Sequence, residues 1–235
     1  MNDLQFPPLF QGEAVTGTAD PFDRAIALAV AGTDPGTVVY NLGGGTLRAS
    51  LIFAPEVPLE EAMSMLPVCG LGFQAALGAL APPEVAVHLD WAGGIRVNGA
   101  TCGRFRARAS GTDPAETPDW LIIGLELNVQ TLEGNPGNDP DRTSLIEEGC
   151  GEVERERLLE SWVRHTLYWI NRWQEDGPRP VHAEWRGLAK NLGEDIDFNG
   201  ETGTFVGVDE FFGMLMRTDG ETKLVPLSTQ LEGSK

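Results

Sequence analysis

Short runs of β-branched and alternating apolar residues, bounded by glycine and proline, occupy the first half of the chain and predict a β-sheet. Two of them, GTVVYN and TLRASLIFAPE, flank the sequence LGGG, which predicts a turn between two strands. The pair Asn98–Gly99 separates two further runs, and this dipeptide favours a tight β-hairpin. The strands expected from these patterns lie at residues 36–41, 46–56, 84–91, 94–99, 101–110 and 119–129.

Three segments have the apolar spacing of helices. The first begins at Asp20, an N-cap candidate, continues with Pro21 at the favoured first helical position, and ends at Gly32. The second, residues 59–80, is rich in alanine, leucine and methionine and is long enough for a buried helix. The third, residues 152–173, carries one amphipathic stripe formed by Leu159, Val163, Leu167, Ile170 and Trp173.

The C-terminal part of the chain follows a different pattern. The segment QEDGPRPVH, residues 174–182, breaks the helical spacing and predicts a linker with His182 on its surface. After it, short strand patterns alternate with Gly, Asn-Gly and Asp-Gly turns, as in a small barrel. We therefore expect two domains, residues 1–182 and residues 183–235.

Composition argues against several classes of protein. With 235 residues, of which 41% are hydrophobic, the chain can bury a substantial core. It contains no run of about 18 apolar residues, and its N-terminus lacks the pattern of a secretion signal, so we expect a cytoplasmic protein. The three cysteines, Cys69, Cys102 and Cys150, form no CxxC pair, which argues against a disulfide framework or a zinc site.

Charge narrows the choice of partners. The chain has 35 acidic and 17 basic side chains, a formal net charge of −18, and so repels nucleic acid and anionic membranes. We expect neither as a partner. Lysine occurs at Lys190, Lys223 and Lys235 and nowhere before them, so chemistry that depends on a lysine is excluded from the first 189 residues.

Five phrases carry a resemblance to a known family: PGTVVY, DWAGGIRVNGATCG, IIGLELNV, SLIEEGCGEVERERLLESW and GTFVGVDEFFGMLMRTDGETKLVPL. Their order and separations resemble the biotin/lipoate protein ligase superfamily, most closely bacterial biotin protein ligase with its catalytic domain and SH3-like C-terminal barrel. The resemblance covers essentially the whole chain. It implies an α+β fold with a class II synthetase-like mixed sheet and helices, followed by a small SH3-like β-barrel. It also implies that a small acyl acid reacts with ATP to give an acyl-adenylate and pyrophosphate, and that the acyl group then passes to an acceptor carrier protein; some relatives transfer the acyl group through a cysteine thioester without ATP.

The resemblance fails at the residues that perform this chemistry. Joining two anions requires fixed positive charge where negative charge develops in the transition state. The family's Lys-Trp-Pro-Asn-Asp strand appears here as Asp90, Trp91, Ala92, Gly93 and Gly94, so that an anion replaces the lysine. Its Gly-Arg-Gly-Arg loop appears as NLGGG, with no arginine before Arg48. The other three departures are Thr101 for the lysine of lipoate ligases, Asp20-Pro21-Phe22 for a Ser-Thr-Asn, and Gly124-Leu125-Glu126-Leu127-Asn128 for a Gly-x-Gly-x-Asn.

Two functions from different classes follow. The first is a diverged binding protein that holds a biotin-, lipoate- or octanoate-like acyl ligand without standard biotinylation. The second is an active enzyme, either an ATP- and Mg²⁺-dependent ligase or a transferase with Cys102 as nucleophile, acting on a carrier protein. A third, structural hypothesis is association into a homodimer. The ligand-binding residues expected for the first are Trp91, Gly93, Gly94, Gly103, Arg104, Gly124 and Asn128.

Each remaining candidate group has a simpler interpretation. Cys102 needs a base or a positive field to form a thiolate, and small buried cysteines are common. The alternation of Arg104, Arg106 and Arg108 places three guanidinium groups on one strand face, where they either hold an anion or pair with nearby acids. Asp90 and Glu126 form a carboxylate pair for acid–base or metal chemistry if their strands are neighbours, and are otherwise exposed or ion-paired carboxylates.

Overall fold

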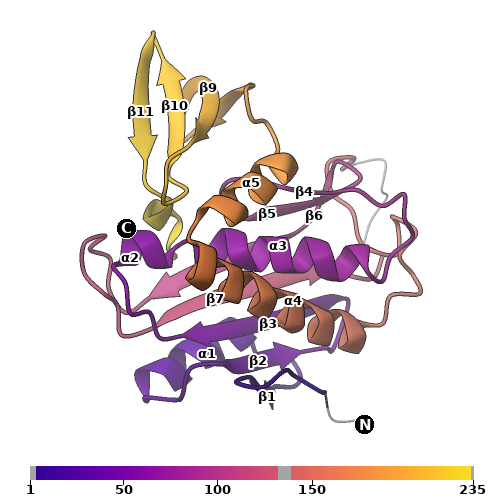
Figure 1. Cartoon of the computed structure of the whole chain (residues 1–235). Helices are drawn as coiled ribbons and strands as arrows, with labels where there is room; N and C mark the ends of the chain where they lie inside the picture. The colour runs from indigo at the N-terminus through magenta and orange to yellow at the C-terminus, as the bar shows by residue number, and fades with distance from the viewer. Residues whose placement is uncertain (1–3, 132–138, 234–235) are drawn as a thin grey trace.

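The computed structural model describes residues 4–131 and 139–233 and contains a seven-stranded and a four-stranded sheet (Figure 1). The strands of the large sheet are β1 (Gln11–Ala14), β2 (Thr37–Asn41), β3 (Thr46–Phe53), β4 (Val87–Leu89), β5 (Gly94–Val97), β6 (Ala100–Ala109) and β7 (Leu121–Asn128). The helices are α1 (Pro21–Val30), α2 (Leu59–Ala62), α3 (Met65–Gly78), α4 (Arg155–Asp176) and α5 (Arg179–Leu188). The small sheet consists of β8 (Asp195–Phe198), β9 (Glu201–Val208), β10 (Met214–Thr218) and β11 (Glu221–Val225), and is followed by the 3₁₀ helix η2 (Leu227–Gln230).

The large sheet is mixed and has the strand order β1-β2-β3-β7-β6-β5-β4. Its edge strand β1 runs parallel to β2, and the other neighbours are antiparallel. The predicted hairpin is confirmed, because Asn98 and Gly99 connect β5 to β6 with φ angles of 50° and 96°. This left-handed backbone at both turn positions is the geometry that an Asn-Gly pair tolerates. The α+β fold class expected from the sequence is thus confirmed.

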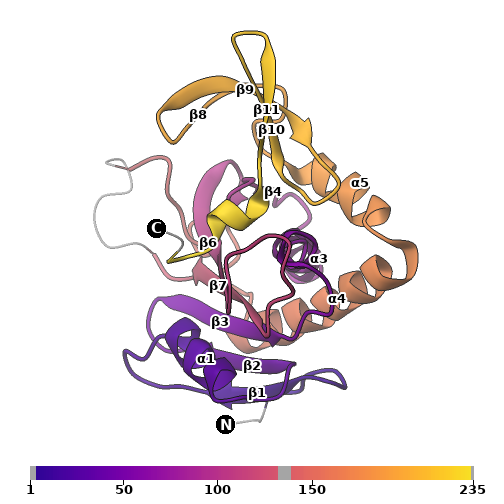
Figure 2. The same ribbon diagram turned by 90° about the vertical axis from the view of Figure 1, so that its left-hand side faces the viewer.

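Helices cover the two faces of the large sheet unequally (Figure 2). On one face, α3 and α4 cover the main core, and Trp162 of α4 donates its indole N–H to the Cys69 carbonyl at 3.0 Å. The helices approach closely because Gly72 has no side chain: a Cβ there would lie 2.8 Å from the Thr166 nitrogen. On the other face α1 packs through Phe22 and its neighbours in a smaller core. Outside this smaller core, that face of the large sheet is not covered by α1.

The helix α1 begins as the sequence predicts. Asp20 is its N-cap, and the carboxylate accepts hydrogen bonds from the Phe22 backbone N–H at 3.0 Å and from Arg106 Nη1 at 2.7 Å. Burial alone would raise the pKa of Asp20. The hydrogen bonds from Arg106 and Phe22, with the charges of Arg106 and Arg48, outweigh this effect and lower the pKa below 3.8. The cap therefore joins α1 to β6 in its ionised form.

The linker predicted at residues 174–182 is wrong. Gly177, with a φ of 72°, ends α4, and α5 begins at Arg179 with a proline in its first turn. Val181 and Trp185 then bury one stripe of α5. His182 lies within this helix, where its ring stacks on Phe212 with centroids 3.9 Å apart. Proline favours the first helical turn as well as linkers, which explains the error.

The C-terminal sheet is open. Its order is β11-β10-β9-β8, and no ladder between β8 and β11 closes it into the expected barrel within the described residues. Its apolar face packs on the first domain, because Phe205, Met214 and Met216 belong to the same core as α3 and β6. The apolar face of the small sheet is therefore buried by packing against the first domain, and closure into a barrel is not needed to bury it. The boundary expected after residue 182 falls inside α5, and the small sheet begins at Asp195.

Trp91 connects the two sheets. It follows β4 and donates its indole N–H to the Phe212 carbonyl at 2.7 Å. Its ring also meets Phe198 edge to face at 5.5 Å. The side chain is 7% exposed, so this hydrogen bond is shielded from water. In the described ranges, no helix combines the length and apolarity needed to cross a bilayer.

We expect Trp91→Phe to destabilise the protein by about 1–3 kcal/mol, because it leaves the buried Phe212 carbonyl without a donor. Urea denaturation measures the loss, and hydrogen exchange in β8–β11 reports whether the small sheet loosens. Trp173→Phe is the control, since it removes the same atoms from a half-buried tryptophan of α4. Equal effects of both substitutions would show that the hydrogen bond contributes nothing specific.

We expect Asp20→Asn to cost about 1 kcal/mol at pH 7, after allowance for solvent screening of a partly exposed pair. Asparagine keeps the cap but loses the charge beside Arg106. Because the folded pKa of Asp20 is lowered, its contribution is complete above 3.8 and is lost as the pH falls through the folded value. Denaturation from pH 7 to pH 3 should therefore show the wild type and the variant converging. The control is Glu13→Gln, which breaks the exposed pair with Arg24. A constant difference in stability between the wild type and D20N across this pH range would contradict the lowered pKa of Asp20.

Candidate functional site

Polar side chains gather on the sheet face beside the N-terminus of α1. The strand registers place Arg48 of β3, Glu126 of β7 and Arg104 of β6 in one transverse row. The next row contains Ser50, Gly124 and Arg106. Both rows lie on the α1 side, since Ile52 and Ile122, two residues further along their strands, pack against α1. The residues that line the resulting pocket are Asp20, Pro21, Phe22, Arg48, Ala49, Ser50, Arg106, Gly124, Leu125 and Glu126.

Arg106 is the most heavily bonded side chain of this pocket. Its Nε and Nη2 donate to the two carboxylate oxygens of Glu232 at 2.8 and 2.9 Å, and its Nη1 donates to Asp20 at 2.7 Å. The guanidinium carbon lies 4.2 Å from the centre of the Phe22 ring. The hydrogen bond to Glu232 is the main reason that the pKa of Arg106 is raised, against the opposing effect of partial burial. Arg106 therefore stays charged and joins three distant segments.

Two polar groups of the pocket lack partners. The Oγ of Ser50 and the Nε of Arg48 are buried, and neither makes a hydrogen bond within the described part of the chain. Each such donor costs about 1–3 kcal/mol if it stays unpaired. The cavity beside them has a volume of about 10 Å³, enough for a single water-sized oxygen. The pocket thus contains two buried donors without partners beside a small cavity.

Phe22 fills the space next to these donors. Its ring packs directly on Gly124, where a Cβ would lie 2.5 Å from the Phe22 Cδ2. A larger residue on β7 would push the ring and α1 away from the sheet. Gly124 therefore allows Phe22 to close the pocket, and a bulky ligand can enter only if this ring moves.

The loop between β2 and β3 is fastened beside the pocket. Asn41 donates from Nδ2 to the carbonyls of Gly17 and Ala19 at 3.1 and 3.0 Å, and its Oδ1 accepts from the Gly43 N–H. Arg155 of α4 donates to the carbonyls of Leu42 and Gly44 at 2.8 and 2.5 Å. These contacts hold the loop in place, and its sequence supplies no cationic side chain to the pocket.

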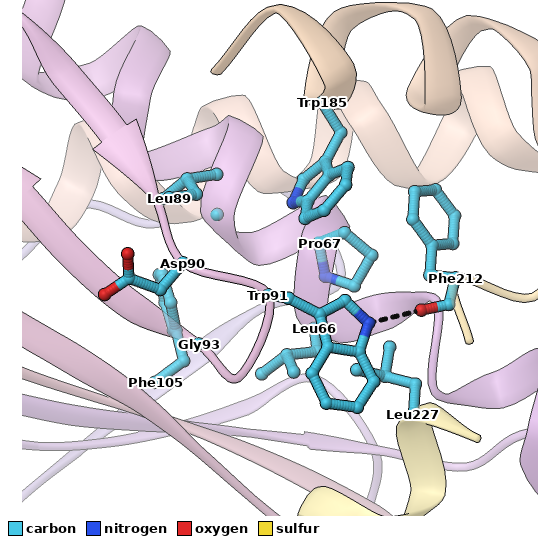
Figure 3. A pocket seen from close by; sticks show the side chains of 11 residues that line it. Leu66, Pro67, Leu89, Asp90, Trp91, Gly93, Phe105, Trp185, Phe212 and Leu227 are labelled. Carbon is cyan, nitrogen blue, oxygen red and sulfur yellow. Dashed lines mark hydrogen bonds between the residues drawn. The ribbon is translucent and has the colours of Figure 1, made fainter. Parts of the chain in front are cut away.

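Trp91 and Gly93, two of the expected ligand residues, line a different, apolar cavity at the junction of the sheets (Figure 3). That cavity also has a volume of about 10 Å³. The local geometry explains why glycine occupies positions 93 and 94. Gly93 has a φ of 91°, and a Cβ there would lie 3.1 Å from the Phe105 carbonyl oxygen, whereas Gly94 leaves room for the Asp90 carboxylate. This cluster therefore lies apart from the pocket beside α1.

Asp90, which the resemblance places at the position of the family's lysine, is paired with a neighbouring arginine. Its carboxylate accepts from Arg96 Nε at 2.8 and 3.1 Å, and Arg96 also donates to the Gly99 carbonyl at 3.2 Å. The hypothesis that Asp90 and Glu126 form a pair is wrong, because β5 and β6 separate β4 from β7. Across residues 4–131 and 139–233, no group of three or more His, Cys, Asp or Glu side chains is arranged to hold a metal ion.

Gly103, Asn128 and Cys102 lie at the far end of β6 and β7. A Cβ at Gly103 would meet the Glu126 carbonyl at 2.4 Å, and Asn128 donates to the Thr143 carbonyl at 3.2 Å. Cys102 is fully buried and contacts the Asn128 carbonyl. Burial, assisted by nearby Cys150 and two glutamates, raises the pKa of Cys102 to about 12. The thiol is therefore protonated at neutral pH, which favours a packing role.

Of the expected ligand residues, Gly124 lines the pocket and Arg104 borders it, where Arg104 pairs with Glu126 at 3.0 Å. The prediction of ligand residues omitted Arg48, Ser50, Arg106 and Phe22, which line the same pocket. The alternation of side chains along β3 and β6 could have identified Arg48, Ser50 and Arg106, because it places them on the same face of the sheet as Gly124. No sequence signal pointed to Glu232, which lies 126 positions from Arg106.

Comparisons with known proteins agree with this fold. The model of the biotin/lipoate A/B protein ligase family matches residues 6–187, and a model of a domain of unknown function matches residues 192–233. A biotin–[acetyl-CoA-carboxylase] ligase from Paracoccus denitrificans is 23% identical over 193 residues, which is 80% of each chain.

Solved structures extend the likeness to the whole chain. A biotin protein ligase-like protein of unknown function from Silicibacter sp. is 58% identical, with a TM-score of 0.92 over 97% of this chain and 99% of that one. Biotin protein ligase from Aquifex aeolicus, at 20% identity, shares the fold with a TM-score of 0.76 over 92% of this chain and 96% of its own. The protein belongs to the biotin/lipoate A/B protein ligase family.

Proposed function

We propose that this protein is a diverged member of its family that binds a small acyl carboxylate, of the biotin, lipoate or octanoate type, in the pocket beside α1 without ATP-dependent ligation. The observation that carries the proposal is the pair of unpaired donors, Ser50 Oγ and Arg48 Nε, on a face lined by Phe22 and Gly124. A carboxylate oxygen would satisfy both donors, and the Phe22 ring would pack against the acyl group. A charge-assisted hydrogen bond from Arg48 would add to the affinity.

The residues of this face do not fit ATP. A triphosphate needs several cations, yet Arg106 is paired with Asp20 and Glu232. Glu126 of the pocket wall pairs with Arg104, so this arginine is not free for a phosphate either. Carboxylates and arginines that balance one another lack the excess positive charge that a triphosphate requires. We therefore derive no step that uses ATP or Mg²⁺.

A second candidate is retained acyl transfer to a carrier protein. The observation in its favour is that Arg48 and Arg106 bring two guanidinium groups to the sheet face, where they could replace the charge of the absent lysine. Transfer through Cys102 is the weaker form of this candidate, since the thiol is buried and its pKa is raised to about 12. Acyl transfer would produce pyrophosphate or an acylated protein. Acyl binding without ligation would produce neither.

Thermal unfolding with biotin, lipoate and octanoate, each with and without ATP and Mg²⁺, tests the proposal. A ligand at about 100 times its Kd adds about 2.7 kcal/mol to the free energy of unfolding, which corresponds to a Tm rise of about 5–10 °C for a protein of this size. We expect one free acid to give such a shift without ATP, and we expect no pyrophosphate release. Pyrophosphate release that depends on the acid would replace this proposal by the second candidate, and no shift with any acid would refute acyl binding.

We expect Arg48→Gln to weaken binding of that acid at least tenfold, because a charge-assisted hydrogen bond is lost. Calorimetric titration of the same acid measures the change. The matched control is Arg164→Gln on α4, since Arg164 is exposed and lies away from the pocket. Equal affinities for the R48Q and R164Q variants would remove Arg48 from the binding site.

A further inference from the structure

The C-terminal segment places a carboxylate of the protein itself beside the pocket. Glu232 is held by the Nε and Nη2 atoms of Arg106 in a two-pronged arrangement, with distances of 2.8 and 2.9 Å. This is the geometry in which an arginine binds the carboxylate of a free ligand. Arg106 keeps Asp20 on its third nitrogen, so the edge that holds Glu232 can exchange its partner without releasing α1.

Arg106 is also positioned to orient a ligand. It lies opposite Gly124 in the β6–β7 ladder, and its guanidinium carbon is 4.2 Å from the centre of the Phe22 ring. Ser50 flanks Gly124 on the other side, in the β3–β7 ladder. A carboxylate bound to Arg106 in place of Glu232 would therefore carry its acyl group toward Phe22 and Gly124.

The attachment of the C-terminal segment is local. The Glu232 N–H donates to the Ala107 carbonyl at 2.8 Å, and Arg108 donates to the Glu232 carbonyl at 2.6 Å. Beyond these bonds, Leu231 forms an isolated bridge with Ala107 and is buried in the main core, so the segment is anchored up to Leu231 and the exchange concerns Glu232. The Glu232 side chain keeps 38% of its surface exposed, so solvent and ligands reach it. A partly exposed side chain exchanges its partner more readily than the core opens.

We infer that Arg106 shares recognition of the acid group with Arg48 and Ser50, and that Glu232 is its resident intramolecular ligand, which an acyl carboxylate must displace. This inference rests on the proposed acyl binding and adds a further residue that recognises the acid group and the segment that competes for it. The competition makes binding selective for a carboxylate over a neutral amide. It also makes the affinity for a ligand depend on how firmly the C-terminal segment is bound.

Octanoate titrated into the wild type and into the variants Glu232→Gln and Glu221→Gln tests the competition. We expect Glu232→Gln to bind octanoate at least tenfold more tightly, because a neutral side chain competes less well for Arg106. Glu221 is exposed on β11, so Glu221→Gln should bind as the wild type does. Octanamide should bind none of the three proteins measurably.

Hydrogen exchange of the Glu232 backbone amide in the wild type gives a second readout. Octanoate should increase its exchange rate, since displacement of the side chain releases the bond to Ala107. If octanoate binds the wild type and Glu232→Gln equally, or binds while the Glu232 amide stays protected, the competition is refuted and acyl binding stands. If neither protein binds octanoate, lipoate or biotin, both the proposed function and this inference are refuted.

Discussion

The ion pairs of Arg106 fix the arrangement on which both the fold and the candidate site depend. One guanidinium joins the N-cap of α1, the middle of β6 and the C-terminal segment through Asp20 and Glu232. Its side chain is 18% exposed, so these hydrogen bonds are only partly screened by water. In a chain with a net charge of −18, an arginine that neutralises two carboxylates also reduces their mutual repulsion. Asp20 and Glu232 occupy different nitrogens of Arg106, so the two contacts are made side by side.

The alternation of side chains along the central strands separates stability from chemistry. On β7, Leu121, Ile123, Leu125 and Leu127 are buried in the core shared with α3 and α4. The residues between them face α1, and there Gly124 and Glu126 line the pocket. Because one face is committed to the core, polar residues on the other can change without disturbing it. The strands are therefore a rigid base for a site of variable chemistry.

The sequence predicted those features whose signals are local. The Asn98–Gly99 hairpin and the Asp20–Pro21 helix start each depend on two adjacent residues, and both are present. The four-residue strand β1, with the sequence QGEA, was missed because it has no apolar alternation of its own and forms by pairing with β2.

Errors arose where the outcome depends on distant partners. The sequence left open whether Asp90 and Glu126 lie on neighbouring strands, and two strands separate them. Of the two interpretations offered for the alternating arginines of β6, pairing with acids agrees with the contacts of Arg104 and Arg106. Which acid pairs with Arg106 could not be inferred, since Glu232 approaches through the packing of the small sheet. Trp91, expected to bind a ligand, donates to the Phe212 carbonyl and lines the apolar cavity between the sheets, and its role in binding stays a prediction.

The carboxylates at the departures expected from the family's motifs are balanced by arginines. Three positions that depart from the family's motifs carry carboxylates: Asp20, Asp90 and Glu126. Each has an arginine partner within hydrogen-bonding distance, at 2.7, 2.8 and 3.0 Å respectively. Without such partners, these charges would cost stability that grows with burial. Since these acids are matched and Arg48 Nε remains without a partner on the described face, the charges of the pocket still favour an anion.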